Sequence, residues 1–467
     1  MTLTHSALVA TTTPLELWRL DAVSVLLLVL IVGIAAAVLP FAHRSMRGDS
    51  NGRLVMAALV AMLIATAGVS LAGSLWVLAI AWSVSTLATL AALAAGGGRR
   101  AIIRSAPWLL AADIALWSAV VLDLTTGTTE APAIMLVIAA VIRCALPPAH
   151  SWLVDSLYAP TPVSAALHGG IVNGGGIVLL TQASLLGSSE VAVALLAVVA
   201  GVGVIVGTLA ALVRTDVKGR LVMSTVAQMG FMLLCVALGL TAAALLHLVA
   251  HGFYKSSLFL ASSDGIDRRA FDRRAPRATL LSPATRFLRV AMGITVPLAA
   301  LISSAVVMYP GGRGFAELLL LVVLAAAFAT VGARLALLMP TVMQAVASVM
   351  AVSAAALAYV SLTSLLTLNM GLSPTTGLGS SVALGAAGVT VLALVTIAIV
   401  RAVAPTSAVG LLLLSLGHRV GAPRTSSLHV ATPRAARNSV ADRTTTPSTT
   451  ADDTMPSPVS ELTGVQS

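Results

Sequence analysis

Apolar residues dominate the chain in long runs, and these runs decide its fold class. Charged residues are absent from the stretches 22–41, 54–93, 191–213 and 341–368. A helix needs about 20 such residues to cross the hydrocarbon core of a bilayer. The strands of a membrane β-barrel would instead show short segments of alternating polarity. The pattern therefore predicts an all-α polytopic membrane protein.

We expect about 13 transmembrane helices, because each needs roughly 20 apolar residues. They lie near 22–42, 54–73, 74–95, 106–124, 131–148, 163–186, 191–213, 219–239, 241–262, 287–309, 315–339, 341–368 and 380–404.

The loops between these segments differ in charge, which predicts the orientation of the chain. The loops near 125–130, 187–190 and 369–379 carry no basic residue, and Arg313 is the exception on that side. Because basic loops stay in the cytoplasm, we expect a multi-pass cell-membrane protein with its N-terminus outside and its C-terminus in the cytoplasm. The basic loops contain Arg44, Arg47, Arg53, Arg99, Arg100, Arg104, Arg214, Lys218 and Arg220, and further along Arg268, Arg269, Arg273, Arg274 and Arg277.

Four regions follow from these patterns. A short N-terminal segment, 1–20, lacks the features of a removable signal peptide. The transmembrane bundle occupies 21–416, with a basic cytoplasmic loop at 264–286. The tail, 417–467, is rich in Ser, Thr, Pro and Arg, and we expect it to be disordered because it cannot bury enough apolar surface to fold.

Composition supports the same fold class. Hydrophobic residues make up 58% of the 467 residues and charged residues 9%, against about a quarter charged in soluble domains. The net charge of +10 lies mainly in short loops, which favours membrane orientation over nucleic-acid binding. Cys144 and Cys235 lie in apolar segments and form no CxxC pair, so we expect neither a disulfide framework nor a cysteine-based zinc site.

The segment HLVAHGFYK places His247, His251 and Lys255 at positions i, i+4 and i+8. Such positions drift only about 80° around a helix while they rise about 12 Å, so two imidazoles and an ammonium line one stripe. Ionisable groups inside a membrane are costly and mark functional candidates. Histidine and lysine both take up and release protons, which predicts a path for protons or other cations.

Lysine usage points to the same helix. Among 27 basic residues, only Lys218 and Lys255 are lysines. Arginine does not readily give up its proton and lysine does, so titration explains why Lys255 is not an arginine. The alternative is a lysine that extends from a helix end to the membrane surface.

Prolines interrupt the chain ahead of this helix. Four of them fall within 16 residues and cannot continue a helix. Irregular backbone at membrane depth is tolerated where it lines a cavity or is covered by protein, which predicts a broken helix; a surface loop explains the pattern equally well. The glycine-rich stretch that follows, 169–176, favours close helix packing. The region contains Pro147, Pro148, Pro160 and Pro162, with His150 and His168 flanking the break.

Two further charges lie inside predicted spans. Asp113 and Arg143 can neutralise one another, Asp113 can pair with a lysine, or the pair can simply hold the bundle together. Ser224, Thr225 and Gln228 form a polar face on the following helix, suited to ordered water or to helix–helix hydrogen bonds. No P-loop, Rossmann, HExxH or Ser/His/Asp pattern appears, nor any quinone, flavin or iron–sulfur signature. We therefore expect a transport or coupling subunit without enzymatic activity, cofactor or metal of its own.

The core from 147 to 263 resembles a known superfamily. It contains PAHSWL, APTPVSAALH, RTDVKGRLVMSTVAQMGF and HLVAHGFYKSSLFLAS in that order. At these residues the sequence resembles the antiporter-like membrane subunits of respiratory complex I and of Mrp-type cation/proton antiporters. Within that superfamily, the form H-x-G-I-V-N-x-G-G is most similar to the DabB-type subunit of inorganic-carbon transporters.

The resemblance implies a bundle with inverted repeats and broken helices. It also implies a partner, a large zinc-containing, carbonic-anhydrase-like subunit of DabA type on the cytoplasmic side. A proton or sodium gradient through this chain would drive the hydration of CO₂ to bicarbonate there. By matching position, the central polar path would contain His168, Lys218, His247, His251 and Lys255, with Asp113 in the place of an acid of the preceding helix.

The sequence departs from complex I-type subunits at three places. Trp82-Ser83 stands where they have a Trp-Glu pair, Arg143 stands where they have a lysine, and no lysine follows Lys255. A simple conduction path coupled to a partner therefore fits better than a complete pump. Three hypotheses remain: a cation-coupling subunit of an inorganic-carbon uptake complex, a proton-pumping subunit of a complex I-like oxidoreductase or Mrp-type antiporter, and a membrane scaffold without transport.

Overall fold

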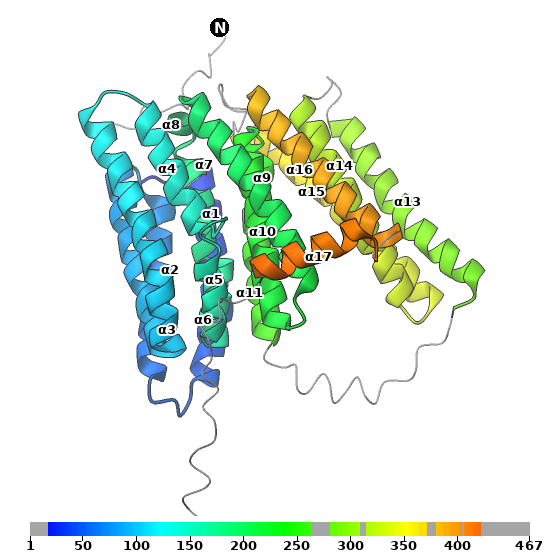
Figure 1. Ribbon diagram of the computed structural model, residues 1–467, viewed down its shortest axis with the longest axis horizontal. Helices are drawn as coiled ribbons and strands as arrows, with labels where there is room; N and C mark the ends of the chain where they lie inside the picture. Colours follow the sequence, from blue (N-terminus) through cyan, green and yellow to red (C-terminus); the bar gives the residue numbers. More distant parts are fainter. Residues whose placement is uncertain (1–16, 263–280, 309–313, 371–379, 404–405, 422–467) are drawn as a thin grey trace, which may run out of the picture. The chain divides into compact units, whose positions relative to one another are not determined.

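The computed structural model describes residues 17–262, 281–308, 314–370, 380–403 and 406–421. Within these ranges every regular element is helical (Figure 1), which confirms the predicted all-α class. Most of the expected basic loop and the tail from 422 onward lie outside the described residues.

The helices follow the predicted order. They are α1 (Ala22–Ser45), α2 (Gly52–Leu71), α3 (Leu75–Thr125), α4 (Glu130–Arg143), α5 (Ser151–Asp155), η1 (Ser156–Tyr158), α6 (Thr161–Gly169), η2 (Ile171–Asn173), α7 (Gly174–Thr181), α8 (Ala183–Gly187), α9 (Glu190–Val213), α10 (Val217–Ala237), α11 (Thr241–Ala261), α13 (Pro283–Met308), α14 (Phe315–Leu338), α15 (Val342–Met370), α16 (Ser381–Val403) and α17 (Ala408–Gly421).

Helix α3 contains two membrane spans that fold back on one another. The indole of Trp117 donates to the Ser83 hydroxyl at 3.1 Å, and the Thr86 hydroxyl donates to the Asp113 carboxylate at 2.8 Å. Residues 27 positions apart in a straight helix would be separated by about 40 Å. The spans Leu75–Gly96 and Ala101–Thr125 therefore run antiparallel, as the sequence predicts for 74–95 and 106–124.

Eleven of the described helices are long and apolar enough to cross a bilayer, so the count of about 13 is not confirmed. Two predicted spans account for the difference. The segment 131–148 contains only the 14-residue helix α4. The segment 241–262 forms α11, a helix of 21 residues whose histidines and lysine lower its mean hydropathy.

Two consecutive membrane segments are discontinuous. The first runs through α4, an irregular stretch and α5; the second runs through α6, η2 and α7 (Figure 1). The proline-rich stretch 147–162 packs largely inside the bundle, because Trp152 and Leu153 within it are fully buried. The break inside the second segment falls in the glycine-rich stretch rather than at the prolines. Our expectation of ordinary helix packing there is thus incomplete.

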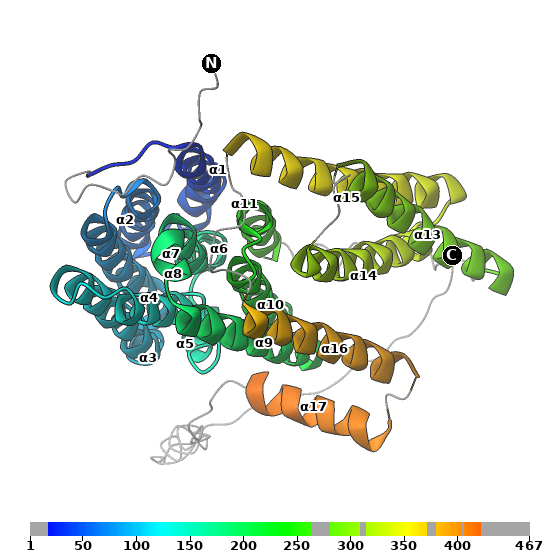
Figure 2. The same ribbon diagram turned by 90° about the horizontal axis from the view of Figure 1, so that it is seen from above.

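One large apolar core joins α1 to α11, and a smaller one joins α13, α14 and α15. Figure 2 shows α13, α14 and α15 grouped together, with α16 beside α9. Helix α17 also packs on α9, where Gly417 lies so close to the Leu209 carbonyl that a Cβ would come within 2.6 Å of it. The helix therefore extends past residue 417, where we expected the tail to begin.

Candidate functional site

Lys255 of α11 is buried, with 1% of its surface exposed. Its ammonium donates to the Ser224 hydroxyl at 2.5 Å and to the Leu221 carbonyl at 3.1 Å, both on α10. A buried charge is costly unless it is hydrogen-bonded, and the Ser224 hydroxyl and the Leu221 carbonyl accept the hydrogen bonds that the ammonium needs. The interpretation of Lys255 as a residue reaching the membrane surface does not fit this geometry.

His168 of α6 contacts the same turn of α10 that holds Lys255. Its Nδ1 is 3.2 Å from the Thr225 hydroxyl, and its ring stacks on Phe259 at 4.2 Å between centroids. The Thr225 hydroxyl donates to the Leu221 carbonyl at 3.0 Å, so it accepts the hydrogen of Nδ1 from a neutral ring. Nε2 then carries a free lone pair and has no hydrogen-bond partner in the described part of the chain. His168 can therefore accept a proton at Nε2.

The two histidines of α11 continue the line away from Lys255. Their ring centroids are 5.8 Å apart, and the His247 ring forms a T-shaped contact with Phe231 on α10, with 5.1 Å between the centroids. His251 is buried, with 4% exposed, whereas His247 is half-buried and Phe253, on the side of α11 away from Lys255, is exposed. Lys255 and His251 therefore face the protein interior, and His247 lies at the border of the exposed face of α11.

This stripe crosses only part of the membrane. Leu221, beside Lys255, lies four residues after the start of α10, and Phe231, beside His247, lies fourteen after it. At 1.5 Å per residue these depths are about 6 and 21 Å, along a helix of 21 residues. Beyond His247, both α10 and α11 carry apolar side chains except for Thr241. The stripe alone therefore does not form a path from one membrane face to the other.

A second buried cluster surrounds Arg143 at the end of α4. The guanidinium donates to the hydroxyls of Thr86, at 2.8 Å, and of Ser85, and it lies over the ring of Trp82 with its Cζ 4.6 Å from the centroid. Thr86 in turn donates to Asp113 at 2.8 Å. A hydroxyl thus bridges the carboxylate and the guanidinium, which form no direct ion pair of 4.0 Å or less in the described residues.

Asp113 also borders the membrane-facing surface of the bundle. It lines an open recess of about 880 Å³ together with Ser83 and Trp117. The carboxylate therefore connects the buried Arg143 cluster to a surface recess.

The two helix breaks bring the clusters together. The Cys144 thiol, in the first break, donates to the Val172 carbonyl in the second at 3.1 Å. A Cβ on Gly174 would lie 3.6 Å from the Arg143 side chain, and a Cβ on Gly252, next to His251, would lie 3.3 Å from the Asn173 amide nitrogen. Asn173 thus lies against α11 at Gly252, and Gly174 lies against Arg143.

Several polar atoms at this junction have no hydrogen-bond partner in the described part of the chain. The atoms are His168 Nε2, His251 Nδ1 and Nε2, Asn173 Oδ1, Arg143 Nε and Trp82 Nε1. Buried polar groups are normally paired with protein or water. Unpaired polar atoms in both clusters and in the break between them are suited to hydrogen bonds with bound water.

The remaining predicted residues lie at the edges of this site. Lys218 is half-buried at the start of α10, about one turn from Leu221. The His150 Nε2 is 3.4 Å from the Val420 carbonyl of α17. Pro148 is exposed, Pro160 is half-buried and Pro162 is buried. The prolines therefore shape the connection ahead of α6 and do not join the polar clusters.

Asn173, Ser85 and Thr86 join the site in the structure, although the sequence pattern does not predict them as site residues. Small polar side chains are common in membrane helices as helix–helix contacts, so nothing in their types distinguishes them. Asn173 offered one signal: it is the one polar side chain within 169–176. The bridging role of Thr86 depends on contacts 27 and 57 residues away, which sequence spacing does not reveal.

Comparisons with known proteins match this core. Residues 121–328 match the family described as NADH:quinone oxidoreductase/Mrp antiporter, TM. The probable inorganic carbon transporter subunit DabB of Bacillus subtilis (strain 168) is 41% identical over 169 residues, which are 36% of this chain and 33% of that protein. The protein of the same description from Hydrogenovibrio crunogenus is 44% identical over 153 residues, 33% of this chain and 29% of that protein.

More distant relatives share less sequence. NADH-quinone oxidoreductase subunit L of Pseudomonas aeruginosa is 38% identical over 124 residues, 26% of this chain and 20% of that protein. The chain thus spans a third or less of the length of these curated relatives. A solved structure, the Mrp complex from Dietzia sp. DQ12-45-1b, aligns over 88% of this chain and 53% of that chain with a TM-score of 0.54 at 23% identity, which shows a shared fold.

The helices, the paired breaks and the buried polar clusters define a multi-pass helical membrane protein with ionisable groups at membrane depth. Its residues 121–328 match the transmembrane model of the NADH:quinone oxidoreductase/Mrp antiporter family. Within that superfamily it is more similar to the DabB subunits named above than to the oxidoreductase subunit. The resemblance seen in the sequence motifs is therefore confirmed.

Proposed function

We propose that this chain is the membrane subunit of an inorganic-carbon uptake complex and conducts protons or sodium ions to energise a partner subunit. The observation that carries the proposal is Lys255, a buried lysine held by Ser224 and Leu221 next to a histidine with a free lone pair. Ionisable side chains at membrane depth mark ion and proton pathways. The DabB relatives supply the substrate class, inorganic carbon.

The path begins at Lys218 and passes through Lys255, His168 and His251. His247 extends this line of residues furthest from Lys218. From His251 the path turns sideways past Asn173 toward the Arg143 cluster and ends at Asp113, which the Thr86 hydroxyl links to the guanidinium. This route is favoured because, beyond His247, α10 and α11 carry apolar side chains apart from Thr241. The unpaired polar atoms along the turn are suited to bound water, which would relay charge between the two clusters.

Arg143 plays a different part from a lysine at the same place. A guanidinium keeps its proton at all physiological pH values, so it holds a fixed positive charge beside Asp113 and does not itself carry a proton. This favours a conduction path over the alternative function, a proton-pumping subunit of a complex I-like NADH–quinone oxidoreductase or Mrp-type antiporter.

The chemistry on inorganic carbon would reside in the partner. We propose a large zinc-containing, carbonic-anhydrase-like subunit of DabA type that binds the cytoplasmic face, where the basic loops gather. Co-purification of the full chain from its native membrane tests this, and a partner set of quinone-reductase subunits would contradict it. A cysteine introduced at Arg53 should react with a membrane-impermeant maleimide only from the cytoplasmic side; reaction from outside would reverse the proposed orientation.

The role of Lys255 is tested by Lys255→Arg in cells that need this system for growth in ambient air. Arginine keeps the charge and donors but does not release a proton, so growth without added CO₂ should be lost and growth at high CO₂ retained. The matched control is Ser257→Ala on the same helix, an exposed hydroxyl bonded only to the Tyr254 carbonyl. Both variants must reach the membrane at equal levels. Unimpaired growth of Lys255→Arg in air would show that this lysine does not carry protons.

A further inference from the structure

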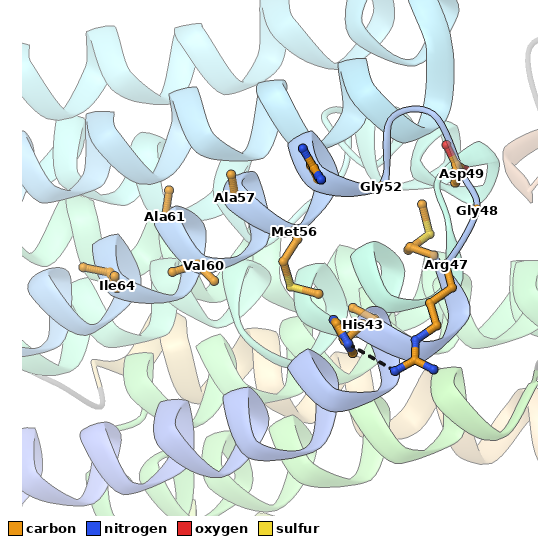
Figure 3. A pocket seen from close by; sticks show the side chains of 13 residues that line it. His43, Arg47, Gly48, Asp49, Gly52, Met56, Ala57, Val60, Ala61 and Ile64 are labelled. Carbon is orange, nitrogen blue, oxygen red and sulfur yellow. Dashed lines mark hydrogen bonds between the residues drawn. The ribbon is translucent and has the colours of Figure 1, made fainter.

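A groove unrelated to the ion path runs between the ends of α1 and α2. It has a volume of about 760 Å³, within the usual range of small-molecule sites, about 300–1,000 Å³. Figure 3 shows its two parts: His43 and Arg47 near the turn between the helices, and Val60, Ala61 and Ile64 along α2. The groove therefore has a cationic end and an apolar length.

The cationic end is built by the turn that joins the helices. The backbone N–H of Asp49 donates to the Met46 carbonyl at 3.2 Å, and Gly48 has a φ of 84°, a conformation that favours glycine. A Cβ on Gly52 would come within 2.6 Å of the Met46 carbonyl, so only glycine lets α2 start this close to α1. The turn thereby places Arg47 and Arg53 at the same end of the groove.

The charge at this end is positive and not neutralised. Arg47 and Arg53 are exposed, and neither forms an ion pair with a described residue. Arg47 donates toward Nε2 of His43 at 3.3 Å. The carboxylate of Asp49 accepts the backbone N–H of Asn51 at 2.8 Å, which leaves two arginines facing one acid. The end therefore suits an anion.

The apolar length matches one leaflet of the bilayer. From Arg53 to Ile64 the groove follows α2 for eleven residues, about 16 Å, and half of the hydrocarbon core is about 15 Å thick. The small side chains of Ala57 and Ala61 leave the groove open along α2, and Ile64 is 67% exposed. A chain lying along this wall would reach the middle of the membrane.

We propose that this groove binds a phospholipid with an anionic headgroup, its phosphate between Arg47 and Arg53 and one acyl chain along α2 toward Ile64. Basic side chains beside a transmembrane helix attract anionic lipids, and here the apolar groove adds a defined place for the chain. The charge complementarity and the match of length to one leaflet favour a lipid over a helix of another protein.

The test uses the full chain in nanodiscs of phosphatidylglycerol and phosphatidylcholine, followed by native mass spectrometry of the lipids that stay bound. We expect phosphatidylglycerol to be retained in preference. Arg47→Gln with Arg53→Gln should reduce its retention about 30-fold, from roughly fivefold for each arginine. Ala57→Leu with Ala61→Leu should also reduce it, because leucines would fill the groove without changing charge.

Arg44→Gln is the matched control, since Arg44 is an exposed arginine of the same helix that does not line the groove. It should leave retention unchanged. Equal loss in Arg44→Gln would mean that anionic lipid gathers around the cationic surface in general, and the proposal would be wrong. Equal retention of the two lipids, or a partner protein cross-linked to Ile64→Cys with no lipid bound, would also overturn it.

Discussion

Thr86 offers a sharp test of the link between Asp113 and Arg143. Its hydroxyl accepts from the guanidinium and donates to the carboxylate, each at 2.8 Å, and the side chain is fully buried. Thr86→Val keeps the shape and removes both hydrogen bonds. A hydrogen bond to a charged group contributes about 1.5–3 kcal/mol, so two at the lower end give a loss of about 3 kcal/mol in the free energy of unfolding.

The matched control lies one turn further along the same helix. Thr89 is also fully buried, but its hydroxyl donates only to the Ser85 carbonyl at 2.8 Å. Thr89→Val should therefore cost about 0.6 kcal/mol, the average for side-chain hydrogen bonds in membranes. The measurement is the unfolding of each purified variant in mixed micelles over a range of denaturing detergent.

Thr86→Ser completes the series, because serine retains the hydroxyl and should recover most of the lost stability. If Thr86→Val and Thr89→Val destabilise the protein equally, the hydroxyl does not couple the two charges and the proposed final step of the path is wrong.

Two further predictions concern the breaks and the packing. Asn173→Leu should abolish ion flux in proteoliposomes, because an apolar side chain leaves no polar group or room for water at the junction, whereas Asn173→Ala should retain part of the flux; equal flux in both variants would remove Asn173 from the path. Gly230→Ala should lower the free energy of unfolding by about 1–3 kcal/mol, because its Cβ would lie 2.7 Å from the Ala200 carbonyl of α9. Gly385→Ala, with no atom within 4 Å of its Cβ, should be neutral or stabilising, and a loss of stability there equal to that of Gly230→Ala would contradict the packing argument.

Local pattern was sufficient for most of the fold. Long apolar runs predict helices because only a helix satisfies its own backbone in lipid, and the predicted segments match α1, α2, both halves of α3, α9, α10, α11 and α13 to α16. The stripe of His247, His251 and Lys255 follows from helical spacing alone. The inward direction of Lys255 and His251 agrees with the cost of placing a charge against lipid.

The breaks were harder to place from the sequence. Prolines mark where a helix cannot continue, and they predict the irregular connection before α6. The interruption at Ile171–Asn173 occurs where glycines offer little resistance to another conformation, and whether they pack or break depends on neighbours. Here the Cys144 thiol takes the freed Val172 carbonyl, a contact between residues 28 positions apart.

The sequence by itself determined the membrane fold class, the order of the helices and the ionisable residues available to the site. The tertiary structure alone decided which of them meet: Lys255 with Ser224, His168 with Thr225, and Arg143 with Thr86. It also brings the two helix breaks into contact, which supports the proposed sideways turn of the path. The physical reason is that periodicity reports the face of one helix, whereas hydrogen bonds between helices depend on how their faces pack.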